Sequence, residues 1–203
     1  MLKDVFYLEV TIIPAAKQKT TTWAGGKTTQ LLIFPPEATL GGRDFLVRVS
    51  SATVELERSD FTTLPGVTRL IMPLSGTMKL EHLADDGSSP PGADPTPFGV
   101  HRFDGGWQTV SHGTCTDFNL MLAQGWEGEM KAVSDGEEVA CGPGQVLCLY
   151  VLEPLEIALP GEKHDLLPGD ALCVELPMHS GQMAVSIKGD GDGLAVMANA
   201  WKI

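Results

Sequence analysis

Arg48 is a cation inside an apolar stretch rich in β-branched residues, FLVRVSSATV over residues 45–54. The alternation predicts a strand that carries Arg48, Ser50 and Ala52 on one face. A guanidinium can offer two parallel hydrogen bonds, so Arg48 could clamp the carboxylate of a ligand. It could also pair with an acidic residue such as Asp117 at a barrel rim, because a buried charge without a partner is costly.

Trp23 and Thr28 flank a short glycine-containing stretch, Gly25-Gly26 followed by a lysine. Glycine lets the backbone turn sharply here. Trp23 could plug the end of a barrel, which is a common role for a single tryptophan. Alternatively, Trp23 could stack on a flat ligand while Thr28 and backbone N–H groups bind the ligand's polar edge.

Asp117 and Asn119 share one face of a predicted strand, TDFNLML at residues 116–122. They could form a structural hydrogen-bonded pair, since buried polar groups are normally satisfied. Alternatively, Asn119 could recognise an amide or imidazole of a ligand. Phe103 and Trp107 could belong to a core or wall a pocket, and the sequence does not separate these two interpretations.

The elements that position these side chains are short strands separated by Pro and Gly turns, such as those at residues 64–66 and 74–76. No segment has a helical period, and residues 84–97 form a long polar loop with several prolines. A weak repeat relates PGQVLC at 143–148 to PGDALC at 168–173. The pattern predicts an all-β chain made of two antiparallel sandwiches or barrels.

Composition narrows the functional classes. The chain has 203 residues and a formal net charge of −12, which argues against a basic surface for nucleic acid or an anionic membrane. No apolar run reaches the roughly 18–20 residues that span a bilayer. The four cysteines form no C-x-x-C pair, which favours reduced thiols in the cytoplasm.

Several ordered blocks between Trp23 and Met121 resemble the HutD/Ves family, bacterial bicupins linked to histidine utilisation. The blocks are Trp23 with GGKT, RDF at 43–45, RVSSA at 48–52, Phe61 with LPGVTR at 64–69, LSG at 74–76 and DFNLM at 117–121. The chain departs from many members in a shorter segment before Thr28 and in Gln30, where glutamate is common. Both departures bear on ligand preference.

The resemblance implies two cupin-like barrels of the jelly-roll (double-stranded β-helix) type in one chain. We expect an N-terminal barrel at residues 1–124, which carries the family motifs, and a C-terminal barrel at residues 125–203. The N-terminal strand, predicted at residues 6–13, could pair with either barrel. The family also implies a small-molecule role in controlling histidine breakdown, with urocanate or a formylated glutamate derivative as the ligand.

A metal-dependent cupin needs a His-x-His pair, a nearby Glu and a later His. The five histidines contain no such pair, so we expect no metal and no cofactor. They are His82, His101, His112, His164 and His179.

We therefore hypothesise a non-enzymatic bicupin that binds a small carboxylate. Arg48 would hold the carboxylate and Trp23 and Phe103 would sandwich the planar part. The residues expected to set orientation or line the site are Thr28, Ser50, Asn119 and Asp117.

The competing hypothesis is a metal-independent isomerase or lyase that acts on a small organic acid, with Asp117 or His101 as general base. A third hypothesis is a scaffold or interaction protein without a pocket. We expect neither nucleic acid nor membrane as a partner, and a homodimer stays open.

Overall fold

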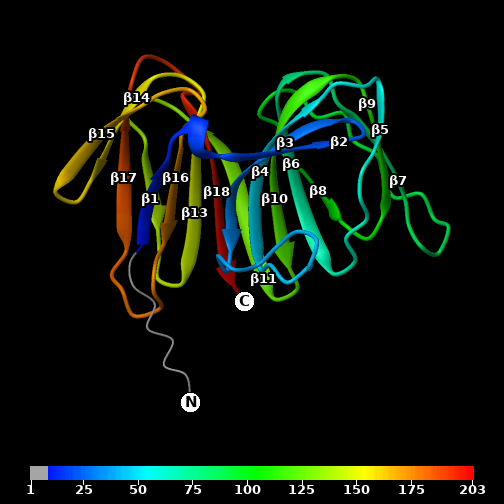
Figure 1. The fold of residues 1–203 in the computed structure, drawn as a ribbon, viewed down its shortest axis with the longest axis horizontal. Coiled ribbons are helices and arrows are strands. Elements are labelled where there is room, and N and C mark those ends of the chain that lie inside the picture. The colour runs from blue at the N-terminus through cyan, green and yellow to red at the C-terminus, as the bar shows by residue number, and fades with distance from the viewer. Residues whose placement is uncertain (1–8) are drawn as a thin grey trace. The chain divides into compact units, whose positions relative to one another are not determined.

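The computed structural model describes residues 9–203, and nearly all of its regular structure is β-strand. The helical structure among these residues is one 3-10 turn, η1 (Ala15–Lys17). The all-β prediction is confirmed. The chain divides into two compact units (Figure 1). We call residues 19–126 the central unit, and residues 9–18 together with 127–203 the terminal unit.

The central unit contains a six-stranded and a three-stranded sheet. The larger sheet runs, in spatial order, β2 (Lys19–Trp23), β3 (Gly26–Phe34), β4 (Val47–Val54), β10 (Cys115–Ala123), β6 (Val67–Gly76) and β8 (His101–Asp104). The smaller sheet runs β5 (Arg58–Asp60), β9 (Gln108–His112) and β7 (Lys79–Leu83).

Strand β10 lies between β4 and β6 and pairs antiparallel with both. Its odd and even positions face opposite sides of the sheet, as the two-residue period of a strand requires. Phe118, Leu120 and Leu122 are fully buried on one side. The other side carries Asp117 and Asn119, together with a methionine. The alternation in the sequence thus separates an apolar face from a polar one.

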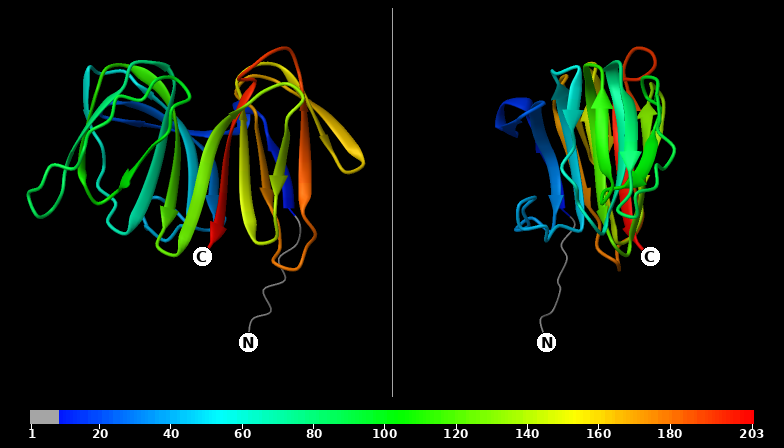
Figure 2. Two further views of the ribbon diagram at one scale, coloured as in Figure 1. Left: turned by 180° about the vertical axis from the view of Figure 1, so that it is seen from behind. Right: turned by 90° about the vertical axis from the view of Figure 1, so that its right-hand side faces the viewer.

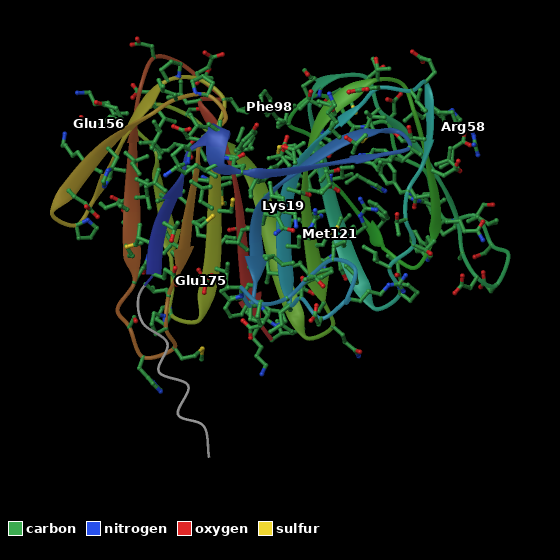
Figure 3. The ribbon with its side chains drawn as sticks, viewed as in Figure 1. Lys19, Arg58, Phe98, Met121, Glu156 and Glu175 are labelled. Atoms are coloured by element: carbon green, nitrogen blue, oxygen red, sulfur yellow. The ribbon has the colours of Figure 1, made fainter. Side chains whose placement is uncertain are left out.

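The register of β10 sets side chains from three strands in rows. Met121 lies opposite Arg48 of β4 and opposite Arg69 of β6, so the two arginines flank it in one row. Asn119 lies opposite Ser50 in the next row. Figure 3 labels Met121 on β10, between the neighbouring strands. Residues far apart in the chain are therefore brought onto one patch of one sheet face.

The terminal unit also contains two sheets. One has the order β1 (Glu9–Ile13), β16 (Ala171–Glu175), β13 (Gln145–Val151), β18 (Ala195–Lys202) and β11 (Trp126–Val133). The other has the order β12 (Glu138–Cys141), β17 (Met183–Lys188), β14 (Leu155–Leu159) and β15 (Glu162–Leu166). The β14–β15 hairpin extends beyond the other strands of this unit (Figure 2).

Both sheets of the terminal unit contribute to one buried core of aliphatic, methionine and cysteine side chains. Leu147, Leu149, Ile157 and Leu172 are among its fully buried members. Each such side chain stabilises the fold by about 1.5–3 kcal/mol relative to an exposed one. This interior is packed with apolar groups, in contrast to the polar face of β10.

The structure adds three strands that the apolar pattern does not indicate, namely β2, β5 and β15. The predicted strand at residues 6–13 is present over Glu9–Ile13, and residues 6–8 lie outside the described residues. It pairs with β16, so within the described chain it belongs to the terminal unit. No helix in residues 9–203 is both long enough and apolar enough to cross a membrane.

Two turn glycines of the central unit, one at each end of β6, provide a matched test of packing. Gly66 and Gly76 have φ values of 78° and 79°, which disfavour any side chain. A Cβ at Gly66 would meet nothing within 4 Å, whereas one at Gly76 would lie 2.2 Å from the carbonyl oxygen of Thr114. We expect Gly66→Ala to cost about 1 kcal/mol of unfolding free energy and Gly76→Ala about 3 kcal/mol. Urea denaturation of both variants measures the difference, and equal costs would contradict the described register.

Candidate functional site

A cavity of about 170 Å³ lies in the central unit, on the polar face of the six-stranded sheet. It is lined by six of the seven site residues expected from the sequence, namely Trp23, Thr28, Arg48, Ser50, Asp117 and Asn119. The structure therefore brings these six residues together. Its wall also contains residues that the sequence did not single out, among them Arg69, Met121, Phe61, Thr21, Thr62 and Leu64.

Arg48 is buried, with 4% of its surface exposed. Its Nε donates to Gln30 Oε1 at 3.2 Å, and its Nη1 donates to Ser50 Oγ at 3.2 Å and lies 3.7 Å from Met121 Sδ. The second terminal nitrogen, Nη2, makes no hydrogen bond within residues 9–203. Arg48 therefore does not pair with Asp117, and its partners in the described chain are neutral.

Arg69 is the second buried cation, at 6% exposure. Its Nη2 donates to Asn119 Oδ1 at 2.9 Å, and its Nε has no partner within the described residues. The guanidinium carbon lies 4.9 Å from the ring centroid of Phe61 and 5.2 Å from that of Phe103. The two rings hold the guanidinium through cation–π contacts without neutralising it.

Asp117 is 1% exposed and accepts a hydrogen bond from Asn119 Nδ2 through its Oδ1. Asn119 thus connects the two charges, because its own oxygen accepts from Arg69. Burial raises the pKa of the Asp117 carboxyl to about 7, although Arg69 and Asn119 act in the opposite direction. The carboxylate is therefore close to its titration point at neutral pH.

Burial lowers the pKa of Arg48 and of Arg69 to about 10. For Arg69, the charge of Asp117 acts in the opposite direction, and the charge of Arg48 adds to the lowering of the pKa. Both guanidinium groups stay protonated at neutral pH. None of the ion pairs in the described chain involves either arginine. The cluster of Arg48, Arg69 and Asp117 therefore carries an excess of positive charge, which a small anion can offset.

Trp23 lies over the backbone of Gly25. A Cβ at Gly25 would lie only 2.2 Å from Cζ3 of the indole, so glycine is needed for this placement. The ring meets Phe61 edge to face, with centroids 6.5 Å apart. Its Nε1 is buried and has no partner among residues 9–203. Trp23 thus brings an aromatic face to the cavity wall.

Phe103 does not line the cavity. It lies in the buried core of the central unit, beneath Arg69 and beside a histidine pair. His82 Nε2 and His101 Nε2 are 3.0 Å apart, and His82 Nδ1 lies 2.9 Å from Thr109 Oγ1. Trp107 packs against His82 in the same cluster. Phe103 supports Arg69 in this arrangement, and His101 does not reach the cavity wall.

Across residues 9–203, no three His, Cys, Asp or Glu side chains gather closely enough to hold a metal ion. The site instead offers guanidinium and amide donors to a ligand. Arg69 is the main functional candidate missed in the sequence. Its signal was present in the LPGVTR block, but the row that joins it to Arg48 depends on both strands pairing with β10.

Comparisons with known proteins agree with this fold. The model of the HutD family matches residues 15–195. The structure of HutD from Pseudomonas fluorescens SBW25 is similar, with a TM-score of 0.73 and 20% identity over 96% of this chain and 100% of that chain. A conserved protein of unknown function, PA5104 from Pseudomonas aeruginosa PAO1, has a TM-score of 0.75 and 22% identity at the same coverage. No curated protein matches the chain.

A more distant similarity identifies the fold class. Oxalate decarboxylase from Lactobacillus farciminis, in a formate complex, has a TM-score of 0.63 at 8% identity, over 99% of this chain and 87% of that chain. At this identity the similarity concerns the fold alone, and it supports a cupin-like architecture.

The buried carboxyl of Asp117 predicts a pH-dependent stability. Its pKa is raised from 3.8 to about 7 in the folded protein, so the folded state holds the proton more tightly than the unfolded state. This contribution stabilises the fold at low pH and is lost as pH rises through about 7. Relative to the wild type, Asp117→Asn should gain about 4 kcal/mol of unfolding free energy between about pH 4 and about pH 8.

Urea denaturation across this pH range measures the change. Asp60→Asn, at an exposed carboxylate, is the control for the loss of one negative charge. Parallel pH profiles for Asp117→Asn and the wild type would show that Asp117 is not buried as described.

Proposed function

The chain belongs to the HutD family, and we propose that it binds a small carboxylate in the cavity of the central unit. The observation that carries this proposal is the convergence of two buried arginines without an acidic ion-pair partner. Arg48 and Arg69 occupy one row, and their guanidinium groups donate to Ser50 and Asn119, which are themselves direct cross-strand neighbours. Both cations therefore lie against the same part of the cavity.

A carboxylate suits this position because its two oxygens can accept from both arginines. The hydrogen bonds of Arg48 within residues 9–203 use its Nε and Nη1, so its Nη2 has no protein acceptor there. Arg69 likewise has a buried Nε without a partner in the described chain. Each charge-assisted hydrogen bond contributes roughly 1.5–3 kcal/mol, so a few of them can hold a small anion. The anion would also relieve the repulsion between the two guanidinium groups.

The remaining wall suits a flat ligand. The indole of Trp23 supplies the aromatic face, and Thr28 lines the cavity in the row of Ala52 and Asp117. Phe103 supports Arg69 from below, so the planar part would contact Trp23 and Phe61 rather than lie between Trp23 and Phe103. Within the family, urocanate or a formylated glutamate derivative meets these demands, which supports a sensing or regulatory role in histidine utilisation.

The architecture of both units supports a bicupin. Each unit has two sheets, and the aliphatic core of the terminal unit draws on both of its sheets. We propose that each unit is one cupin-like barrel. The four cysteines form no disulfide with one another, and the Sγ atoms of Cys148 and Cys173 are 4.0 Å apart, which favours a reducing compartment such as the cytoplasm.

The position of Asp117 favours one alternative function. A carboxyl with a pKa of about 7 on a cavity wall could act as the general base of a metal-independent isomerase or lyase. The discriminating experiment is turnover. Chemical change of a bound small acid that is lost in Asp117→Asn would favour the enzyme, and unchanged ligand after prolonged incubation would favour binding alone.

Arg48→Lys tests the carboxylate site. Lysine keeps the charge but offers a point donor in place of a planar fork, so affinity for urocanate or N-formylglutamate should fall by about tenfold or more. Titration calorimetry measures the affinity, and thermal melts monitor the fold. Arg58→Lys is the matched control, because Arg58 is exposed on β5, pairs with Asp60 and lies away from Met121 (Figure 3).

A purely structural role of Arg48 predicts a different result. If Arg48 only stabilises the sheet, Arg48→Lys lowers the melting temperature and leaves the affinity of the folded protein unchanged. That outcome, or failure of the wild type to bind any small carboxylate, would remove the proposed function.

A further inference from the structure

We propose that Asp117 accepts a hydrogen bond from the bound ligand, so that the cavity selects small carboxylates carrying an N–H or O–H donor away from the carboxylate. This inference rests on the carboxylate-binding function proposed above. It adds the chemical group at the other end of the ligand and assigns the residue that recognises it.

Asn119 makes two side-chain hydrogen bonds, one to each charged neighbour. Its Oδ1 accepts from Arg69 Nη2 at 2.9 Å, and its Nδ2 donates to Asp117 Oδ1. These two contacts fix the orientation of the amide and occupy its only oxygen with an arginine. Asn119 is therefore a positioning residue that holds Arg69 and Asp117, and it is poorly placed to recognise a donor on the ligand.

The carboxyl group of Asp117 has a second oxygen, Oδ2, to which Asn119 does not donate. Asp117 lines the cavity and is 1% exposed, and the side-chain hydrogen bond that it accepts within residues 9–203 goes to Oδ1, which leaves Oδ2 without a protein donor. A buried carboxylate oxygen without a donor is costly, and a ligand N–H or O–H would satisfy it. The cavity thus presents unpaired donors at its arginines and an unpaired acceptor at Asp117.

The spacing of residues along β10 sets the distance between Asp117 and the two guanidinium groups. Asp117 lies four residues from Met121, which is two rows away from the row of the two arginines. The guanidinium groups of both arginines reach the row in between, where they donate to Ser50 and Asn119. The remaining separation is about one row, or roughly 7 Å. A carboxylate and a donor separated by a short chain fit this distance.

The groups around Asp117 determine how binding depends on pH. Arg69 faces it from β6 and Arg48 lies on β4, and both stay charged because their pKa values are about 10. Cys115, on the same strand, stays a neutral thiol because burial and Asp117 raise its pKa to about 12. Burial lowers the pKa of His82, on β7, to about 4 and that of His101, on β8, below its usual value. Asp117 is therefore the group of this set that titrates between about pH 6 and about pH 8.5.

Two matched probes test the inference. Succinamate carries a carboxylate and a terminal amide, and 4-oxopentanoate replaces the amide NH₂ by a methyl group of similar size. Neither probe titrates near neutral pH. We expect the affinity ratio of succinamate to 4-oxopentanoate to rise about tenfold between about pH 6 and about pH 8.5, because ionised Asp117 accepts a hydrogen bond from the amide and is left without a donor beside the methyl group.

Calorimetry on the full chain and on Asp117→Asn decides the outcome. In the variant, the ratio should be independent of pH. A constant ratio in the wild type, with both probes bound, would overturn the role of Asp117 while leaving the carboxylate site intact. If neither probe binds the folded wild type, the carboxylate site itself is refuted. If the variant does not fold, the wild-type ratio alone decides between these results.

Discussion

Two like charges, buried on either side of Met121 in one row of the sheet, are the constraint on which this site depends. Arg48 and Arg69 remain cationic although burial disfavours their charge, and the one carboxyl connected to them, Asp117, is itself partly neutral at pH 7. A structure that only needed stability would replace such a cluster with apolar side chains at little cost. The excess of positive charge therefore supports the proposed binding of a small anion there.

Strand β10 makes this arrangement because it is shared by β4 and β6. Its register sets Met121 between the two arginines and Asn119 beside Ser50, while its opposite face is buried and apolar. A shift of one residue would exchange these two faces and scatter the cluster. The apolar face of β10 thus fixes the geometry of the polar one.

The sequence predicts the parts of this site that follow from local periodicity, such as the shared face of Arg48 and Ser50. It does not predict the contribution of Arg69, because the row that joins the arginines depends on strand pairing over long distances in the chain. Phe103 was expected at the ligand, yet it packs beneath Arg69. The strand β2 was missed because its residues are polar and exposed, and it is stabilised by pairing with β3.

Nitrogen-15 NMR of the arginine Nε–Hε groups tests the central claim most directly. The signals of Arg48 and Arg69 can be assigned with lysine variants at each position, and Arg58 serves as an internal control. During a titration with succinamate, the Arg48 and Arg69 signals should both shift with a single shared Kd while the Arg58 signal stays in place. Shifts at Arg58 alone, or different Kd values for Arg48 and Arg69, would contradict a single anion held between the two buried arginines.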